Sequence, residues 1–268
     1  MELSVLSAQV EQIVRQAADS FHQAFTTTQK DSPSNIVTTA DLAVQAFLER
    51  ELCTLLPGSA FFGEEGTAGS LSAEYLWIVD PIDGTANFSR GIGECGISVA
   101  LLCRQTLLLG VVYNPFQDKL YSAVRDGGAW CNGRPIRVSG KSFREGLLCT
   151  ALSLYRKEYA QQCMAVIGEA YAQCNDIRRF GSCALELCYL AEGKCDLYFE
   201  FRVFPWDCAA AHLILEEAGG VIRGQNGQKV TFDRATPIIA ANTQENFDRL
   251  NAIVQKHIPQ FPYKEILR

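Results

Sequence analysis

The chain has 268 residues, of which 48% are hydrophobic and 20% charged, with 21 Gly and 9 Pro. This is ordinary globular composition, and it excludes a disordered chain, a collagen and a small disulfide framework. The formal charge of −6 argues against a surface that binds nucleic acid or an anionic membrane. With only 3 His, a metal site in this chain must be built mainly from oxygen or sulfur ligands.

The 11 cysteines form no CxxC motif, since no two lie closer than Cys183 and Cys188. Zinc-ribbon and thioredoxin-like folds are therefore excluded. The first residues lack the basic and apolar regions of a secretory signal. No uncharged apolar run reaches the roughly 18 residues that span a membrane. We expect a cytoplasmic protein with no membrane partner, whose cysteines are reduced packing residues.

The first half of the chain is predicted to pack helices on an antiparallel meander. Apolar residues at three- and four-residue steps predict a long helix over 3–28, which Ser32-Pro33-Ser34 would break. A second helix is predicted from near Thr38 to Pro57-Gly58. Strand-like runs follow, with turn signals at Gly127-Gly128 and Asn132-Gly133. These runs are 76–79, 97–101, 107–113 and 119–124.

After about residue 140 the pattern changes to alternating strands and helices, which is typical of a layered α/β arrangement. The predicted strands are 147–152, 177–180, 195–201 and 236–241, and the predicted helices are 155–173, 183–192, 206–218 and 243–257. Gly219-Gly220 is a typical helix C-cap signal. We predict two parts, 1–140 and 141–268, that pack as one compact unit with a cleft between them.

Two aspartates follow a buried strand in the segment Asp80-Pro81-Ile82-Asp83-Gly84-Thr85. Pro81 fixes its own φ and cannot continue a strand ladder, so the chain must turn there and can direct both carboxylates into one space. Carboxylates that lie this close repel each other unless a cation sits between them. Gly84 and Thr85 then offer exposed backbone amides to an anion. A solvated turn remains the alternative, since Asp, Pro and Gly all form turns.

Three further acidic segments are candidates for the same site, each with a structural alternative. Glu64-Glu65 follow an apolar pair, so at least one of them should face inward, although the pair could simply begin a polar loop. Asp207 stands at the expected start of a helix, where it could equally act as a cap. Thr38-x-x-Asp41 resembles a capping box, with Asp in place of the usual Glu or Gln.

Together these acids favour a magnesium site. Carboxylate and carbonyl oxygens without histidine suit Mg²⁺ far better than Zn²⁺. Two or three such cations beside exposed amides are suited to hydrolysing a phosphate ester. The chain contains no GxxxxGK[ST], no GxSxG and no GxGxxG after a strand, so it offers no support for a P-loop, a serine triad or a dinucleotide fold.

The motifs resemble the signatures of the inositol monophosphatase family. The resemblance rests on Gly63-Glu64-Glu65, on the segment from Trp77 to Phe88, and on Trp206-Asp207-x-Ala209-Ala210 through Gly219-Gly220. Supporting matches include Cys131-Asn132-Gly133, Gly181-Ser182-x-Ala184-Leu185 and Asp196-x-Tyr198-x-Glu200. They occur in family order from about residue 30 to 242 and cover nearly the whole chain. The resemblance implies a layered αβαβα sandwich, of mixed α+β and α/β character, as in the related fructose-1,6-bisphosphatases.

The resemblance implies two to three Mg²⁺ ions per site. Glu64, Asp80 and the backbone carbonyl of Ile82 would hold the first ion. The second would lie between Asp80, Asp83 and Asp207.

A third, weaker ion lies near the glutamates in the family. Glu65 would assist there, and Lys30 matches a family lysine close to that ion and the phosphate. Thr85, hydrogen-bonded to Asp41, would act with Glu64 to activate the attacking water.

The resemblance also implies which residues would bind the phosphate and the alcohol of the substrate. The resemblance assigns the amides of Gly84 and Thr85 to the phosphate oxygens and places Asp83 and Asp207 beside the substrate. It assigns Glu200 to the hydroxyls of the alcohol. Gly181, Ser182 and Cys183 would line the same pocket. Arg179 could reach a second phosphate or could be a solvent-facing charge.

The resemblance implies a phosphoric monoester hydrolase that is Mg²⁺-dependent and lithium-sensitive. The expected substrate is a small phosphorylated polyol or sugar, first of all myo-inositol monophosphate. The shared motifs leave open fructose 1,6-bisphosphate, 3′-phosphoadenosine 5′-phosphate and histidinol phosphate. A regulatory or RNA-associated binding protein is a second alternative, to which the acidic charge lends no support. A homodimer is the expected assembly.

Overall fold

The chain is described by a computed structural model, in which residues 1, 33–34, 67–70, 153–156 and 262–268 are left undescribed. Two sheets carry most of the strands. The first has the strand order β3-β4-β5-β6-β7-β8-β9, and the second has the order β11-β10-β12-β14-β13. A separate hairpin pairs β1 with β2. The expected break at Pro33-Ser34 and the start of the helix expected over 155–173 lie outside the described residues.

The first sheet is an antiparallel meander from β4 onwards, as the sequence predicts, with β3 added in parallel to β4. Its strands are β3 (Ala60–Gly63), β4 (Tyr75–Asp83), β5 (Gly96–Cys103), β6 (Thr106–Asn114), β7 (Lys119–Val124), β8 (Ala129–Cys131) and β9 (Arg134–Ile136). The second sheet contains β10 (Leu147–Ala151), β11 (Asp176–Arg178), β12 (Leu197–Val203), β13 (Val221–Arg223) and β14 (Thr236–Ala241). The hairpin strands are β1 (Thr27–Ser32) and β2 (Asn35–Thr38).

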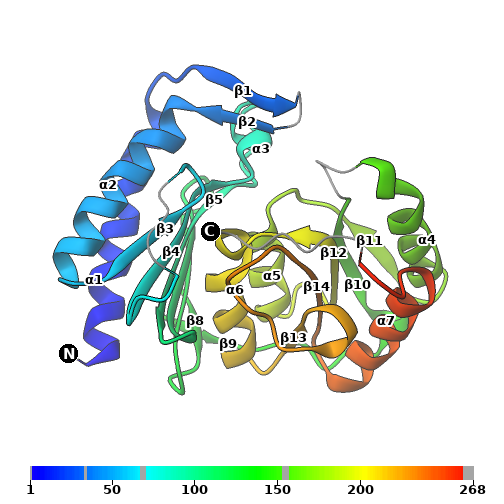
Figure 1. Ribbon diagram of the computed structural model, residues 1–268. Coiled ribbons are helices and arrows are strands. Elements are labelled where there is room, and N and C mark those ends of the chain that lie inside the picture. Colours follow the sequence, from blue (N-terminus) through cyan, green and yellow to red (C-terminus); the bar gives the residue numbers. More distant parts are fainter. Residues whose placement is uncertain (1, 33–34, 67–70, 153–156, 262–268) are drawn as a thin grey trace.

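Helices cover both sheets and fill the space between them (Figure 1). The α-helices are α1 (Leu3–Ala17), α2 (Thr39–Leu55), α3 (Thr85–Phe88), α4 (Ala160–Tyr171), α5 (Cys183–Ala191), α6 (Pro205–Glu217) and α7 (Gln244–His257). Short 3₁₀ turns occur at η1 (Ala18–His22), η2 (Phe143–Glu145), η3 (Lys157–Tyr159) and η4 (Gln225–Gly227). Helices α1 and α2 lie outside the first sheet, α5 and α6 lie between the sheets, and α4 and α7 lie outside the second sheet (Figure 1). The layers follow the expected αβαβα order.

The described residues form three apolar cores between the layers. Val10, Val44 and Trp77 belong to the core between the outer helices and the first sheet. The middle core surrounds α5 and α6, which are buried on nearly every side and therefore carry small residues such as Ala209 and Ala210. Gly110 lets the first sheet approach α6, because a Cβ there would lie 2.5 Å from the carbonyl oxygen of Ala210.

The structure corrects two expectations for the N-terminal segment. The helix predicted over 3–28 ends at Ala17, and η1 follows it. The chain then turns into β1, because Thr26-Thr27-Thr28 is a β-branched run that favours extended backbone. Of the stretch from Lys30 to Asn35 that was expected as a break, the described residues 30–32 and 35 are strand residues of the β1–β2 hairpin, which pairs Thr27 with Thr38.

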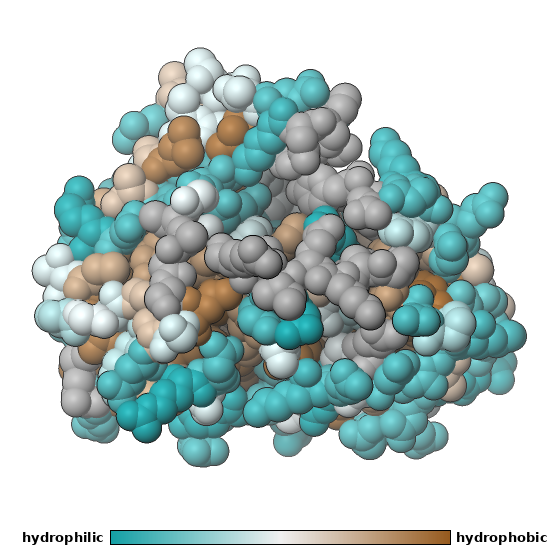
Figure 2. All heavy atoms as spheres, viewed as in Figure 1, coloured by the Kyte–Doolittle hydropathy of each residue, from teal (hydrophilic) through white to brown (hydrophobic). Residues whose placement is uncertain are grey.

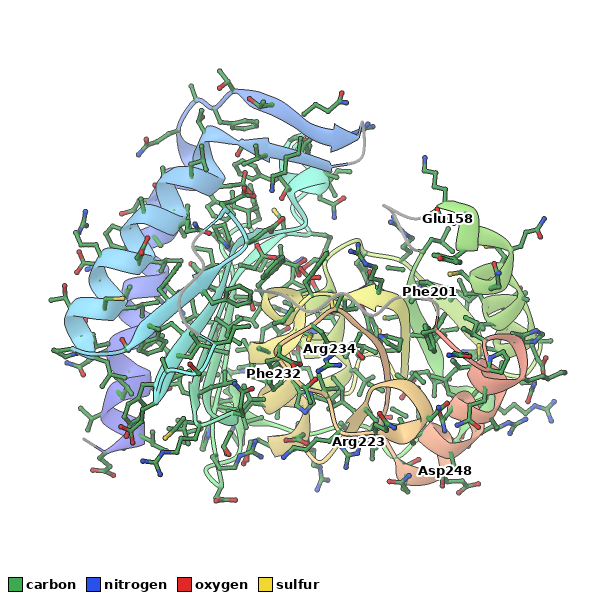
Figure 3. All side chains as sticks on the ribbon, viewed as in Figure 1. Glu158, Phe201, Arg223, Phe232, Arg234 and Asp248 are labelled. Carbon is green, nitrogen blue, oxygen red and sulfur yellow. The ribbon has the colours of Figure 1, made fainter. Side chains whose placement is uncertain are left out.

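The carboxyl ends of the parallel strands β10, β11 and β12 face the end of β4 and form a cleft there. Along β12 successive side chains alternate between the two faces of the sheet. Phe201 points toward α4 and stacks on Tyr159 at a centroid distance of 4.9 Å (Figure 3). Glu200 and Arg202 point to the opposite face and line the cleft.

Among the described helices, none combines the length and apolar character that a membrane-spanning segment needs. Hydrophilic side chains cover most of the lower and right-hand edges of the face shown in Figure 2. The expected antiparallel meander and the alternating second half are both present, in one layered fold.

Candidate active site

The end of β4 forms the turn that the sequence predicts around Pro81. The pairing of β4 with β5 shifts register between Asp80 and Asp83, which marks an irregularity at the proline. The backbone amide of Ile82 donates to Asp80 Oδ1 at 2.9 Å, so the aspartate is held by its own turn. Asp80 is 1% exposed and Asp83 is 7% exposed, so neither carboxylate is the surface acid of a solvated turn.

The third aspartate reaches the same point from the other half of the chain. Asp207 lies in the first turn of α6, where its Oδ2 accepts a hydrogen bond from the Phe204 amide at 2.8 Å. It therefore caps the helix and also faces the cleft. One carboxylate oxygen from each of Asp80, Asp83 and Asp207 lies within 4.8 Å of the others.

Asp83 connects the two halves of the molecule. Its Oδ2 accepts hydrogen bonds from Ser182 Oγ at 2.5 Å and from the Ala184 amide at 2.7 Å. Both donors lie at the start of α5, so this helix fixes the orientation of the carboxylate. Ser182 also caps α5 by accepting a hydrogen bond from the Leu185 amide at 3.3 Å.

The electrostatics of the cluster favour a bound cation. The pKa of Asp80 is raised well above its usual value by burial and, to a smaller extent, by the negative charge of Glu64. The pKa of Asp207 is likewise raised by burial and by the charge of Asp83. Burial raises the pKa of Asp83 to about 6 and that of Glu64 to about 7. Carboxylates gathered this closely are destabilised as anions unless positive charge enters. An all-oxygen donor set of this kind fits Mg²⁺.

Glu64 and Glu65 stand at the end of β3, next to the cluster. The Glu64 amide donates to the Val79 carbonyl at 3.2 Å and thereby aligns the ends of β3 and β4. Lys30 Nζ lies 2.6 Å from Glu65 Oε1 and 3.5 Å from Glu64 Oε1. Burial alone would lower the pKa of Lys30, but the two carboxylates raise it, so the lysine is charged and partly offsets the acids.

Asp41 and Thr85 form a hydrogen-bonded pair behind the cluster. Asp41 is fully buried in a capping box at the start of α2, where its Oδ2 accepts from the Thr38 amide at 2.7 Å. Thr85 Oγ1 lies 3.3 Å from Asp41 Oδ1 and 3.0 Å from the Ile82 carbonyl oxygen. The capping function of Asp41 and its contact with Thr85 coexist, because each uses a different carboxylate oxygen.

Gly84 turns the chain between the acids and α3. Its φ of +92° lies in the left-handed region, and a Cβ there would lie 3.0 Å from the Glu94 carbonyl oxygen. Glycine is therefore required both for the backbone angle and for the close approach. The turn leads directly into Thr85, the first residue of α3, and both residues line the cleft.

The same cleft is lined by the residues predicted for the alcohol, Gly181, Ser182, Cys183 and Glu200. Arg179, predicted to reach a second phosphate or to face solvent, lines it as well. Glu200 Oε2 accepts a hydrogen bond from Tyr198 Oη at 2.5 Å, and burial raises the pKa of Glu200 to about 7.

Three predicted residues are not among those that line the cleft: Lys30, Asp41 and Glu65. Residues that the sequence reasoning did not select also line it: Ile36, Ala86, Ala151, Glu186 and Arg202. Strand alternation from Glu200 could have found Arg202, and the four-residue helical step from Ser182 could have found Glu186.

The fold and this acidic cleft define a metal-dependent phosphatase, and the comparisons identify its family. The model of the "Inositol monophosphatase family" matches residues 3–259. The "Nus factor SuhB" of Vibrio cholerae is 36% identical over 198 residues, 73% of this chain and 74% of that protein. The human "Inositol monophosphatase 2" is 33% identical over 247 residues, 90% of this chain and 84% of that protein.

A solved structure shares the whole architecture. The "extragenic suppressor protein suhB" of Bartonella henselae superimposes with a TM-score of 0.87 and 30% identity, covering 95% of this chain and 100% of that one. The chain belongs to the inositol monophosphatase family. It is accordingly a phosphatase of phosphate monoesters, of a family that depends on Mg²⁺. The residue roles within the site stay predictions.

Proposed function

We propose that the chain hydrolyses myo-inositol monophosphate to inositol and phosphate. The observation that carries the proposal is the convergence of Asp80, Asp83 and Asp207 within 4.8 Å, in one cleft with Gly84, Thr85 and Glu200. We assign the cations and the phosphate to the part of the cleft lined by the three aspartates, Gly84 and Thr85, the metal end. We assign the hydroxylated alcohol to the part lined by Cys183 and Glu200, the alcohol end.

The metal ligands are assigned from the family resemblance and supported by the donor set. Glu64, Asp80 and the Ile82 carbonyl would hold one Mg²⁺, and Asp80, Asp83 and Asp207 a second. A third ion would lie near Glu65. Bound there, Mg²⁺ supplies Lewis acidity that polarises the phosphate and offsets charge on the attacking and leaving oxygens.

The chain's own groups would activate and align the attacking water. Glu64 and Thr85 would accept its hydrogens, with Asp41 orienting the threonine hydroxyl through the contact at 3.3 Å. The amides of Gly84 and Thr85 would hold phosphate oxygens. The water attacks phosphorus in line with the leaving oxygen, so no covalent phosphoenzyme forms. Asp207 would lie beside the leaving oxygen.

Glu200 supports a polyol as the alcohol. A half-buried carboxylate in the lining of the cleft can accept hydrogen bonds from ring hydroxyls. Lys30 would assist near the third ion, and Arg179 could meet a second phosphate in an alternative substrate. Those alternatives are fructose 1,6-bisphosphate, 3′-phosphoadenosine 5′-phosphate and histidinol phosphate.

Phosphate release from these four substrates, at equal concentration in Mg²⁺, tests the proposal. We expect the highest kcat/KM for inositol 1-phosphate. A clear preference for another of the four would overturn the substrate assignment while leaving the chemistry in place. Release that is equally fast in EDTA would contradict the chemistry itself.

A second candidate is a regulatory, RNA-associated role, favoured by the similarity to proteins named Nus factor SuhB. The charge of −6 does not supply the basic footprint that RNA contact usually needs. A gel-shift assay with structured RNA tests this role. Retardation of the RNA at physiological salt would support it.

A cytoplasmic location and a homodimeric assembly belong to the same proposal. Sedimentation equilibrium tests the dimer, for which a mass of twice 29.6 kDa is expected.

A further inference from the structure

Glu186 is a buried acid in the wall of the cleft to which the proposed reaction assigns no role. It lies in the first turn of α5 and is 1% exposed. It lines the cleft together with Asp83, Gly181 and Glu200. Buried acids are uncommon unless their hydrogen bonds are satisfied, so the partners of Glu186 show what it does.

Its hydrogen bonds go to one loop. Oε1 accepts from the Phe180 amide at 2.6 Å and from the Gly181 amide at 2.8 Å. Oε2 is buried and has no hydrogen-bond partner among the described residues. Burial raises the pKa of Glu186 to about 8, so the group is largely neutral near pH 7, with a carbonyl-like oxygen facing the two amides.

The same loop is held from its opposite side by Asn87. Asn87 Nδ2 donates to the Phe180 carbonyl and to the Glu94 carbonyl, both at 2.7 Å. Gly181 packs against this amide, since a Cβ there would lie 3.1 Å from Asn87 Nδ2. The backbone at Phe180–Gly181 is therefore fixed by Glu186 on one side and by Asn87 on the other.

The next residues of the loop bind a predicted metal ligand. Ser182 Oγ and the Ala184 amide donate to Asp83 Oδ2 at 2.5 and 2.7 Å. Asp83 thus receives its orientation from a segment whose own position depends on Glu186. The path from Glu186 to Asp83 consists of hydrogen bonds and a few backbone units.

We propose that Glu186 is a positioning residue for the metal site. By holding the Phe180 and Gly181 amides, it sets how Ser182 and Ala184 meet Asp83, and thereby the orientation of the Asp83 carboxylate toward Asp80 and Asp207. The inference rests on the proposed function, because it assigns Glu186 an effect on Mg²⁺ binding at that site.

Calorimetric titration of Mg²⁺ tests the inference without any substrate. Glu186→Met keeps the length of the side chain and removes the acceptor, so we expect Mg²⁺ affinity to fall about tenfold, as when partners of metal ligands are removed. Glu186→Gln keeps a carbonyl oxygen that accepts from both amides, so its Mg²⁺ affinity should stay within about twofold of the wild-type value. The Mg²⁺ concentration for half-maximal phosphate release should shift in parallel.

A matched control separates positioning from loss of stability. Leu187→Ala, the neighbouring position of α5, opens a cavity in the core between the sheets and removes none of the side-chain hydrogen bonds that hold the loop or Asp83. It should lower the melting temperature without changing Mg²⁺ affinity. If Glu186→Met does not fold, Asn87→Ala removes the opposite support of the same loop and should weaken Mg²⁺ binding in the same direction.

The outcomes are separable. Wild-type Mg²⁺ affinity in folded Glu186→Met overturns the inference, and so does wild-type affinity in Asn87→Ala if that variant is used instead. A Glu186→Gln variant that binds Mg²⁺ as weakly as Glu186→Met also overturns it. If wild type binds Mg²⁺ but releases no phosphate from any substrate, the proposed function fails while the positioning role is still decided by affinity. A wild type that binds no Mg²⁺ overturns both.

Discussion

The metal end and the alcohol end of the cleft are assembled differently. At the metal end, three acids are held by partners within three residues: Asp80 by the Ile82 amide, Asp41 by Thr38 and Asp207 by the Phe204 amide. At the alcohol end, Arg179, Cys183 and Glu200 come from the end of β11, the start of α5 and β12, which are brought together only by the fold. Changes at the metal end should therefore affect the chemical step, and changes at the alcohol end the choice and binding of substrate.

Replacing Asp83 should give the largest effect. Asp83→Asn keeps the shape and an oxygen for Ser182 and Ala184 but removes a ligand charge, so we expect kcat to fall on the order of 10³-fold. Phosphate release at saturating Mg²⁺ measures it.

The melting temperature of this variant in EDTA should not fall, because one repulsive charge has left the cluster. Asp118→Asn, an exposed acid paired with Arg15, is the matched control and should keep wild-type activity. Wild-type activity in Asp83→Asn would contradict the assignment of Asp83 as a metal ligand.

Removing the Thr85 hydroxyl should have a smaller effect at the same end. Thr85→Ala takes away the group that Asp41 orients for the attacking water, and kcat should fall about 10²-fold. Thr85→Ser retains the hydroxyl and should recover most of the activity. The Mg²⁺ affinity of both variants, measured by calorimetry, should equal that of wild type. Equal kcat values for Thr85→Ala and Thr85→Ser would show that the Thr85 hydroxyl takes no part in the mechanism.

A change at the alcohol end should alter selectivity while sparing the chemistry. Glu200→Gln replaces an ionisable acceptor for ring hydroxyls, and KM for inositol 1-phosphate should rise about tenfold, as for the loss of one strong hydrogen bond. Hydrolysis of p-nitrophenyl phosphate, which has no alcohol hydroxyls, should be unaffected. A parallel loss on both substrates would place Glu200 at the metal end instead.

The free energy of unfolding should depend on pH through the buried acids of the metal end, and we expect this effect to be smaller than those of the substitutions. Burial raises the pKa of Glu64 from 4.5 to about 7 and that of Asp83 from 3.8 to about 6, so the folded chain binds protons more tightly than the unfolded chain. This stabilisation is full below pH about 4 and is lost as pH rises through 6 to 7. In EDTA, the melting temperature should fall by about 10 °C between pH 5 and 8.

Adding Mg²⁺ should reverse this loss. At pH 8 the carboxylates are ionised and bind the cation, so the rise in melting temperature on adding Mg²⁺ should be larger at pH 8 than at pH 5. Differential scanning calorimetry measures both. Equal increments at the two pH values would mean that the cluster does not hold the ion.

Short sequence motifs explain how much of the site and the fold could be predicted from the sequence. The turn at Pro81, the capping box of Thr38 and Asp41, and Asp207 at the start of α6 are each encoded within a few residues, so the metal end was recognisable from motifs. The β1–β2 hairpin was not, because β1 is short and polar and its pairing depends on tertiary contacts. Arg202 lies two residues after Glu200 on β12, so strand alternation could have predicted it, whereas Ile36 and Ala151 meet the cleft only through the tertiary fold.

An anomalous-difference map from crystals soaked in Mn²⁺, as a stand-in for Mg²⁺, tests the central claim most directly. The account predicts a peak between Asp80, Asp83 and Asp207 and another between Glu64, Asp80 and the Ile82 carbonyl. A cleft without peaks at saturating Mn²⁺, or ions bound only elsewhere on the chain, would contradict it.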